Sequence, residues 1–301
     1  SWEEVRERDL PHLEGLVAEA AVGDVSTKIG RQRASSTDAY LTMGAGTRAT
    51  APAIELAVAL DPDESYAGVR TAEVLERRLG RVPSGVAYLA AGAALDLNER
   101  GPFGGRPGTL GERLGEEGVH RAVIANADAV EGFVSDEPPP EGSYARGAAT
   151  MLMGPDGIVP GGTVGRSLLV DDPHAPFGRR LDHEAVLEAF EAEWERPGRA
   201  VVLVEASDLS RAAAYGPRAT SGQRSALWDE AVASSDELLG ELLARVDPST
   251  DAVLVISPVS SGSQPELGLV ALRTPDVDAG VLRSATTRRD GYVQLADVAP
   301  T

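Results

Sequence analysis

Apolar residues recur at helical spacing at several places along the chain. Near its start, Leu10, Leu13, Leu16, Val17 and Ala20 fall on one face of a helix. A Ser/Thr/Asp cap or a closing Gly marks the ends of such segments, and Asp182 and Gly80 are predicted to have these roles. The same spacing predicts further helices within residues 64–80, 109–118, 182–198 and 221–247.

Short apolar runs between these segments predict strands. The run at 199–208 is so continuously apolar that we expect an interior strand rather than an edge strand. Strands that alternate with helices favour an α/β fold, here a three-layer α/β/α sandwich with a largely parallel central sheet in a single domain, 1–301. The other predicted strands lie within 21–29, 120–128 and 251–258, and a hairpin is predicted at 148–162.

The strand predicted within 251–258 is followed by a polar, Gly-containing loop. In an open α/β sheet, ligands bind just beyond the carboxyl ends of the strands. Ser257 and Pro258 occupy that position, yet neither is a general acid or base, and Pro cannot ligate a metal. The sequence therefore puts Ser257 and Pro258 where a ligand would be expected, although neither side chain is suited to catalysis.

Composition narrows the possible functions. The 28 Lys and Arg residues against 47 Asp and Glu give a net charge of −19, which disfavours nucleic acid and anionic lipid surfaces as partners and favours solubility. The absence of cysteine excludes disulfides and thiolate metal sites. No run reaches the ~18 apolar residues of a membrane span, and no signal peptide is visible. We expect both ends to have been cut from a longer protein.

Familiar catalytic motifs are missing. The four histidines have no partners at metal-ligand spacing, and the sequence has neither a phosphate-binding G-x-x-x-x-G-K-[ST] loop nor a G-x-S-x-G elbow. Adjacent Arg288 and Arg289 are suited to hold an anionic group, although a solvated charge cluster has the same appearance. The Pro-rich segment around Pro138 predicts a surface loop or flap.

Two other places carry candidate chemistry. Three consecutive hydroxyl residues, Ser35, Ser36 and Thr37, precede Asp38 ahead of an apolar stretch, which makes this a candidate site, although Ser/Thr followed by Asp is also an ordinary helix-cap signal. Asp208 follows a predicted buried strand, where a carboxylate is a candidate metal or substrate ligand, or else a cap for the next segment.

Five stretches follow one another in a characteristic order: LPHLEGLVAEA, SSTDAYLTMGAG, VVLVEASDLSRAAAYG, DELLGELLARVDPSTDAVLVISP and SATTRRDGYVQLADVAPT. Together they resemble the alkaline phosphatase superfamily, which includes sulfatases, nucleotide pyrophosphatases and phosphoglycerate mutases. They match its T-P-N-L-D-x-L motif, the stretch around its nucleophile, its strand with Asp-x-x-x-His, its strand ending in Ser-Asp-His-Gly, and its closing V-D-x-A-P-T. The resemblance spans nearly the whole chain and is closest to membrane-anchored actinobacterial proteins with such an ectodomain.

The chain departs from this family where the family binds metal. By the resemblance, Ser35 or Ser36 is the nucleophile position, and Asp208 and Asp38 are the remaining candidate ligands. The family's first metal-binding Asp would precede the start of this chain. The expected histidines and the Asp-His pair fall on residues that ligate metal poorly: Ala212, Ser257, Pro258, and Thr286 or Thr287.

Losing these ligands predicts a loss of catalysis. Two-metal hydrolysis depends on ions held about 4 Å apart, which stabilise the leaving oxygen and activate the nucleophile. We therefore expect a non-catalytic, extracytoplasmic, membrane-anchored domain that binds an envelope partner as a scaffold or sensor and needs no cofactor. The alternative is an atypical phosphate- or sulfate-ester hydrolase or transferase acting on envelope glycans or lipids. It would use Ser35 or Ser36, the Asp38 and Asp208 carboxylates with Zn, Mn, Mg or Ca, and Arg288 or Arg289.

Overall fold

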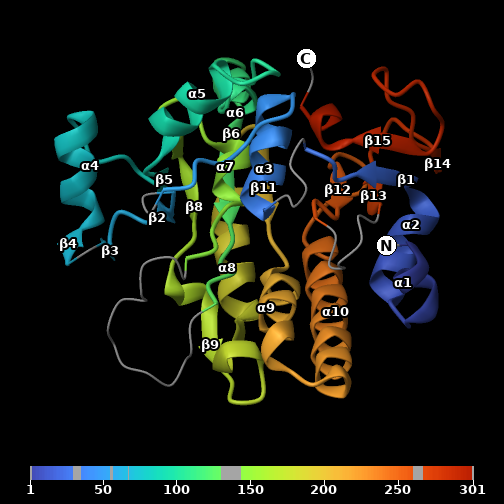
Figure 1. Ribbon diagram of the computed structural model, residues 1–301. Coiled ribbons are helices and arrows are strands. Elements are labelled where there is room, and N and C mark those ends of the chain that lie inside the picture. The colour runs from blue at the N-terminus through green and yellow to red at the C-terminus, as the bar shows by residue number, and fades with distance from the viewer. Residues whose placement is uncertain are drawn as a thin grey trace.

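The computed structural model describes residues 2–29, 35–54, 57–66, 68–129, 144–259 and 267–299 (Figure 1). The fold is mixed α/β, as predicted, with both parallel and antiparallel strand pairs. Within the described residues, no helix is both long enough and apolar enough to cross a membrane. The Pro138 loop lies outside the described residues.

The largest sheet has the order β12-β13-β1-β14, and β15 also pairs with β1. The strand β1 runs parallel to β14 and β15 but antiparallel to β13, which is also antiparallel to β12. The expectation of a largely parallel sheet therefore holds only in part. The strands are β1 (Ala21–Ser26), β12 (Val253–Ile256), β13 (Gly268–Arg273), β14 (Gly280–Val281) and β15 (Tyr292–Gln294).

A second sheet, β11-β6-β8, is parallel throughout. It consists of β11 (Ala200–Val204), β6 (His120–Ile124) and β8 (Gly161–Thr163). The remaining strands form small antiparallel units at the periphery. These are β2 (Ala59–Leu60), β5 (Val86–Tyr88) and β7 (Ile158–Val159), and the pairs β3 (Ser65–Tyr66) with β4 (Val69–Arg70) and β9 (Leu169–Asp171) with β10 (Arg179–Leu181).

Helix α10 packs against both main sheets. Thr220 and Gln223 form a capping box at its start, and the helix continues for 23 residues. Its Leu238 and Leu242 pack in the apolar cluster that contains Val202 and Val204 of β11. Its Val232 and Leu239 pack in another cluster, with Val255 of β12. One helix therefore packs against the same side of β11 and β12.

On the opposite side, β11 and β12 share a core beneath α3. Val201 and Leu203 of β11 and Ile256 of β12 pack against a cluster that includes Leu41 and Met43. The other helices flank these layers. The helices are α1 (Trp2–Glu7), α2 (Pro11–Glu19), α3 (Ser36–Ala45), α4 (Thr71–Leu79), α5 (Ala91–Glu99), α6 (Thr109–Glu116), α7 (Ala149–Leu152), α8 (His183–Trp194), α9 (Ser207–Tyr215) and α10 (Ser221–Leu243).

Most predicted elements are present, including the Asp182 cap and the left-handed Gly80. Three details differ. Residues 149–152 form a helix instead of the first strand of a hairpin, and residues 65–66 and 69–70 form a strand pair ahead of a shorter helix. Among the residues that the structure describes, the apolar run 200–204 is an edge strand, contrary to expectation. It is apolar because both of its faces are covered by helices, although one of its edges is open.

The open edges of β11 and β12 face a common gap. Glu205 donates its N–H to Ile124 of β6, and Arg199 accepts from His120, so alternate residues of β11 direct their backbone groups to β6. The backbone groups of Val202 and Val204 therefore point to the other edge. Most Cα atoms of β11 lie more than 8 Å from every Cα atom of β12, whereas directly paired strands are about 4.7–4.9 Å apart.

The same alternation applies to β12. Ser257 donates its N–H to Leu269 of β13, so Val255 also points to β13, and Leu254 and Ile256 point to the gap. Within the described residues, neither strand has a ladder partner on its gap side.

Amide hydrogen exchange tests this arrangement. We expect the paired amides of Leu203 and Val255 to exchange slowly, and those of Val202, Val204 and Leu254 to exchange at least tenfold faster, because the latter donate to no strand. NMR-detected exchange measures each amide separately. Equal protection of both sets would mean that β11 and β12 pair directly.

Candidate functional site

The gap between β11 and β12 is a cleft of about 1070 Å³. Every residue of both strands lines it, together with Ser36, Tyr40 and Met43 from one side of α3 and leucines of α10. The lining is mainly apolar, and Ser36, Tyr40, Glu205 and Ser257 are among its polar residues. Such a volume and lining are typical of ligand sites, which measure roughly 300–1,000 Å³.

Glu205 is the buried carboxyl group at the end of β11 in this cleft. Tyr40 donates its hydroxyl to Oε1 at 2.9 Å, and Ser207 donates to Oε2 at 2.8 Å. Burial raises the pKa of Glu205 above its usual value, although these two hydrogen bonds and the charge of Arg211 oppose the shift. Burial also raises the pKa of Tyr40, and the nearby Glu205 raises it further. Glu205 is thus the perturbed acid of the site.

Asp208, the candidate metal ligand, begins the first turn of α9 and is buried. The Arg211 guanidinium, which is fully buried, lies 2.6 Å from its Oδ1. The N–H of Leu181 also donates to the carboxylate, at 3.1 Å. A second guanidinium nitrogen of Arg211 donates to the carbonyl of Asn126, so the pair ties α9 to the ends of β6 and β10.

Ser35 and Asp38 cap helix α3. The Ser35 hydroxyl accepts the N–H of Asp38 at 3.1 Å, and Asp38 Oδ2 accepts the N–H of Ser35 at 2.9 Å. The other Asp38 oxygen accepts the N–H of Ala51 at 2.6 Å. Ser35 and Asp38 thus form a helix cap, one of the two roles that the sequence allowed. Ser36, the first residue of the helix, lines the cleft.

Arg288 and Arg289 lie elsewhere, in the exposed turn before β15. Arg288 has a left-handed backbone, with φ of 54°, and donates its N–H to Ser284. Neither arginine lines the cleft.

The structure thus brings Ser36 together with Ser257 and Pro258 in the cleft, and separates the cleft lining from Asp38, Asp208 and both arginines. Sequence reasoning missed Tyr40, Glu205 and Arg211. A signal existed for Glu205, since a carboxylate directly after an apolar run marks the strand's end as well as Asp208 does. For Arg211 the signal was its position three residues after Asp208, which places both on one helix face.

The residues at this end of the sheet fit a metal poorly. Asp208 already accepts from a buried guanidinium and a backbone N–H, and a divalent ion would have to displace the guanidinium. Ala212, Ser257 and Pro258 offer no carboxylate or imidazole. Hard cations need several oxygen ligands, so no catalytic step is assigned to a metal here.

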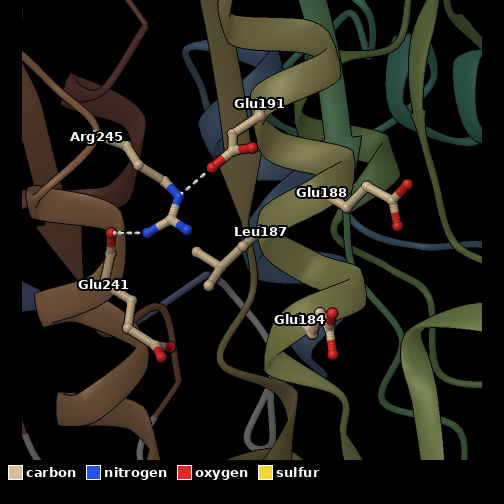
Figure 2. A pocket seen from close by; sticks show the side chains of 6 residues that line it. All are labelled: Glu184, Leu187, Glu188, Glu191, Glu241 and Arg245. Carbon is tan, nitrogen blue, oxygen red and sulfur yellow. Dashed lines mark hydrogen bonds and ion pairs between the residues drawn. The ribbon is translucent and has the colours of Figure 1, made fainter.

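A second, shallower pocket of about 440 Å³ lies between α8 and the end of α10 (Figure 2). Arg245 bridges the two sides, reaching Glu191 Oε1 at 2.5 Å and the Glu241 carbonyl at 2.8 Å. Glu184 and Glu188 also line the pocket, so its charge is mainly negative. The bridge explains how α8 is fastened to α10, and we assign the pocket no ligand.

Comparisons with known proteins give no family. No protein-family model matches the chain, and no curated protein matches it. Among solved structures, it is similar to the PH0037 protein from Pyrococcus horikoshii, with 11% sequence identity over 98% of this chain and 87% of that chain, and a TM-score of 0.48.

Breaking the Asp208–Arg211 pair should destabilise the protein. Arg211→Met leaves a buried carboxylate without its counter-charge, which typically costs about 3–5 kcal/mol. Urea unfolding should show this loss, while Asp208→Asn with Arg211→Met should lose less than the two single variants together. Arg180→Met, which removes an exposed pair with Asp172, is the control and should cost under about 1 kcal/mol. A loss that small for Arg211→Met would contradict the structural role of the pair.

The raised pKa of Glu205 should also appear in stability. Its folded-state pKa exceeds the usual 4.5, so the folded protein binds the proton more readily, and the free energy of unfolding falls as pH rises through this window. Glu205→Gln should remove that fall. The difference between variant and wild type should change by up to about 1.4 kcal/mol per pH unit inside the window.

Tyr40→Phe provides the companion measurement. It removes a hydrogen bond that lowers the Glu205 pKa, so the fall should extend to higher pH than in the wild type. If the free energy of unfolding changed with pH in the same way for wild type, Glu205→Gln and Tyr40→Phe, the prediction of a raised Glu205 pKa would be wrong.

Proposed function

We propose that the chain is a non-catalytic binding domain whose site is the cleft between β11 and β12. The observation that carries this proposal is the engagement of the candidate catalytic groups: Ser35 and Asp38 cap α3, and Asp208 is neutralised by Arg211. The cleft that lies beside them is large and apolar, which suits binding.

The motif resemblance extends the proposal. In an alkaline-phosphatase-like three-layer α/β/α domain, catalysis would occur at the carboxyl ends of the strands that here end in Glu205 and Ser257. The resemblance implies an extracytoplasmic domain, anchored through segments beyond this chain, that serves as a scaffold or sensor for an envelope partner. The −19 net charge supports a partner other than nucleic acid.

One observation favours the alternative of an ester hydrolase. Ser36 lies at the start of α3 and lines the same cleft as Glu205, so a hydroxyl and a perturbed acid share one cavity. A helix N-terminus also attracts anionic groups. Against this, the carboxylates that would hold a metal are committed to other contacts.

An activity assay separates the two functions. The protein is incubated with p-nitrophenyl phosphate or p-nitrophenyl sulfate and Zn²⁺, Mn²⁺, Mg²⁺ or Ca²⁺. We expect release of p-nitrophenol at the same rate for wild type, Ser36→Ala and buffer, because no ion is held beside the serine. Ser35→Ala is the structural control, which should lose only the roughly 1 kcal/mol of a helix cap.

Metal-dependent turnover that disappears in Ser36→Ala but persists in Ser35→Ala would refute the proposal and establish the hydrolase. Ser36 serves here because its side chain is no part of the α3 cap, so its loss should leave the fold intact.

A further inference from the structure

Ser234, His183 and Glu241 form a hydrogen-bonded chain where α8 meets α10. His183 Nε2 lies 3.1 Å from Ser234 Oγ, and His183 Nδ1 lies 3.0 Å from Glu241 Oε2. His183 is the first residue of α8, whereas Ser234 and Glu241 both belong to α10, about two helical turns apart. One imidazole ring therefore connects two side chains on the same face of the facing helix.

The order of these contacts determines which way each hydrogen bond runs. An ionised Glu241 carboxylate only accepts hydrogen bonds, so the neutral His183 ring carries its proton on Nδ1 and donates it. The lone pair of Nε2 is then free to accept the hydroxyl of Ser234. A hydroxyl, a base within hydrogen-bond reach and a third group that orients the base are the elements that activate a serine as a nucleophile.

This group lies at the surface of the protein. The side chain of His183 is 18% exposed and that of Glu241 is 44% exposed, while Ser234 is partly buried. Glu241 also lines the shallow pocket between α8 and α10 (Figure 2). Ser36 in the cleft has no such arrangement, because no histidine is found among the described residues that line the cleft.

The charges beside the group favour a neutral reagent. Glu184 and Glu188 line the neighbouring pocket together with Glu241. Among the described residues of that lining, Arg245 is the only cation, and it is paired with Glu191. A negative surface of this kind repels phosphate and sulfate esters but has little effect on an uncharged acyl ester or thioester.

We infer that Ser234 is an acyl-acceptor site, with His183 as its general base and Glu241 as a positioning residue. The Ser234 oxygen attacks the carbonyl carbon of a neutral activated ester or thioester, and His183 Nε2 takes the hydroxyl proton. The new Oγ–C bond replaces the bond to the leaving alcohol or thiol, which receives that proton from His183.

This inference goes beyond the proposed binding function and concerns a different part of the molecule. Rapid hydrolysis of an acyl-serine also needs hydrogen-bond donors for the tetrahedral oxyanion. The side chains of Ser234, His183 and Glu241 supply the nucleophile, the base and its orientation, but no such donors. We therefore expect one acylation per chain rather than sustained turnover.

The probe is p-nitrophenyl acetate, applied without added metal. We expect a burst of about one equivalent of p-nitrophenol per chain, and peptide mass spectrometry should find at least tenfold more acetyl group on Ser234 than on Ser235. Ser234→Ala should remove the burst. Ser235→Ala is the matched control and should keep it, because the neighbouring Ser235 hydroxyl donates to the carbonyl of Ala231.

Two further variants test the roles of the partners. His183→Gln and Glu241→Gln should each slow acetylation of Ser234 at least tenfold, whereas His174→Gln, at an exposed histidine, should not. All three should keep the wild-type circular dichroism spectrum. Nitrogen-15 NMR of the His183 ring should show the proton on Nδ1 in the wild type and a mixture of tautomers in Glu241→Gln, a change that a purely structural role of Glu241 would not produce.

Three outcomes would overturn the inference. They are a burst that persists in Ser234→Ala, acetylation of Ser234 no greater than that of Ser235, and labelling by p-nitrophenyl phosphate as efficient as labelling by the acetate. Each would leave the proposed function of the cleft intact. Sustained metal-free turnover that Ser234→Ala removes would instead support Ser234 as the nucleophile and contradict the non-catalytic function.

Discussion

Helix α10 is the element on which the arrangement of the two main sheets depends. It packs against β11 through Leu238 and Leu242 and against β12 through Leu239 and Val232. Between these contacts the two strands are held apart, so the helix supports two sheet edges without closing them. The cleft is therefore a consequence of how a 23-residue helix covers the sheets, and its position follows from apolar residues on adjoining faces of that helix.

The polar groups near the cleft are used for structure. Asp208 and Arg211 form a buried pair, and a pair of this kind is costly to break because either charge alone would be left in a poorly solvated environment. Asp38 accepts two backbone N–H groups and fixes the start of α3 against the segment at Ala51. These contacts position α3 and α9 at the strand ends, where Glu205, Tyr40 and Ser36 are among the polar groups that line the cleft.

The sequence predicted helices, strands and their caps better than it predicted which strands pair and which side chains are in contact. The spacing of Leu13 and Leu16, the cap at Asp182 and the left-handed Gly80 are local signals, and each corresponds to an observed element. The edge position of β11 could not be predicted, because an apolar run reports burial of its two faces and carries no information about its hydrogen-bonding edges. In the same way, Asp208 and Asp38 are candidate ligands or caps in the sequence, but their partners Arg211 and Ala51 are evident only in three dimensions.

These features together leave little side-chain chemistry at the ends of β11 and β12. Pro258 and Ala212 bring no ligand to the strand ends, and the nearby carboxylate of Asp208 is already neutralised. Side-chain chemistry at the mouth of the cleft is thus reduced to hydroxyls and one buried acid. The backbone N–H and C=O groups of Val202, Val204, Leu254 and Ile256 also point into the cleft, where they lie among apolar side chains.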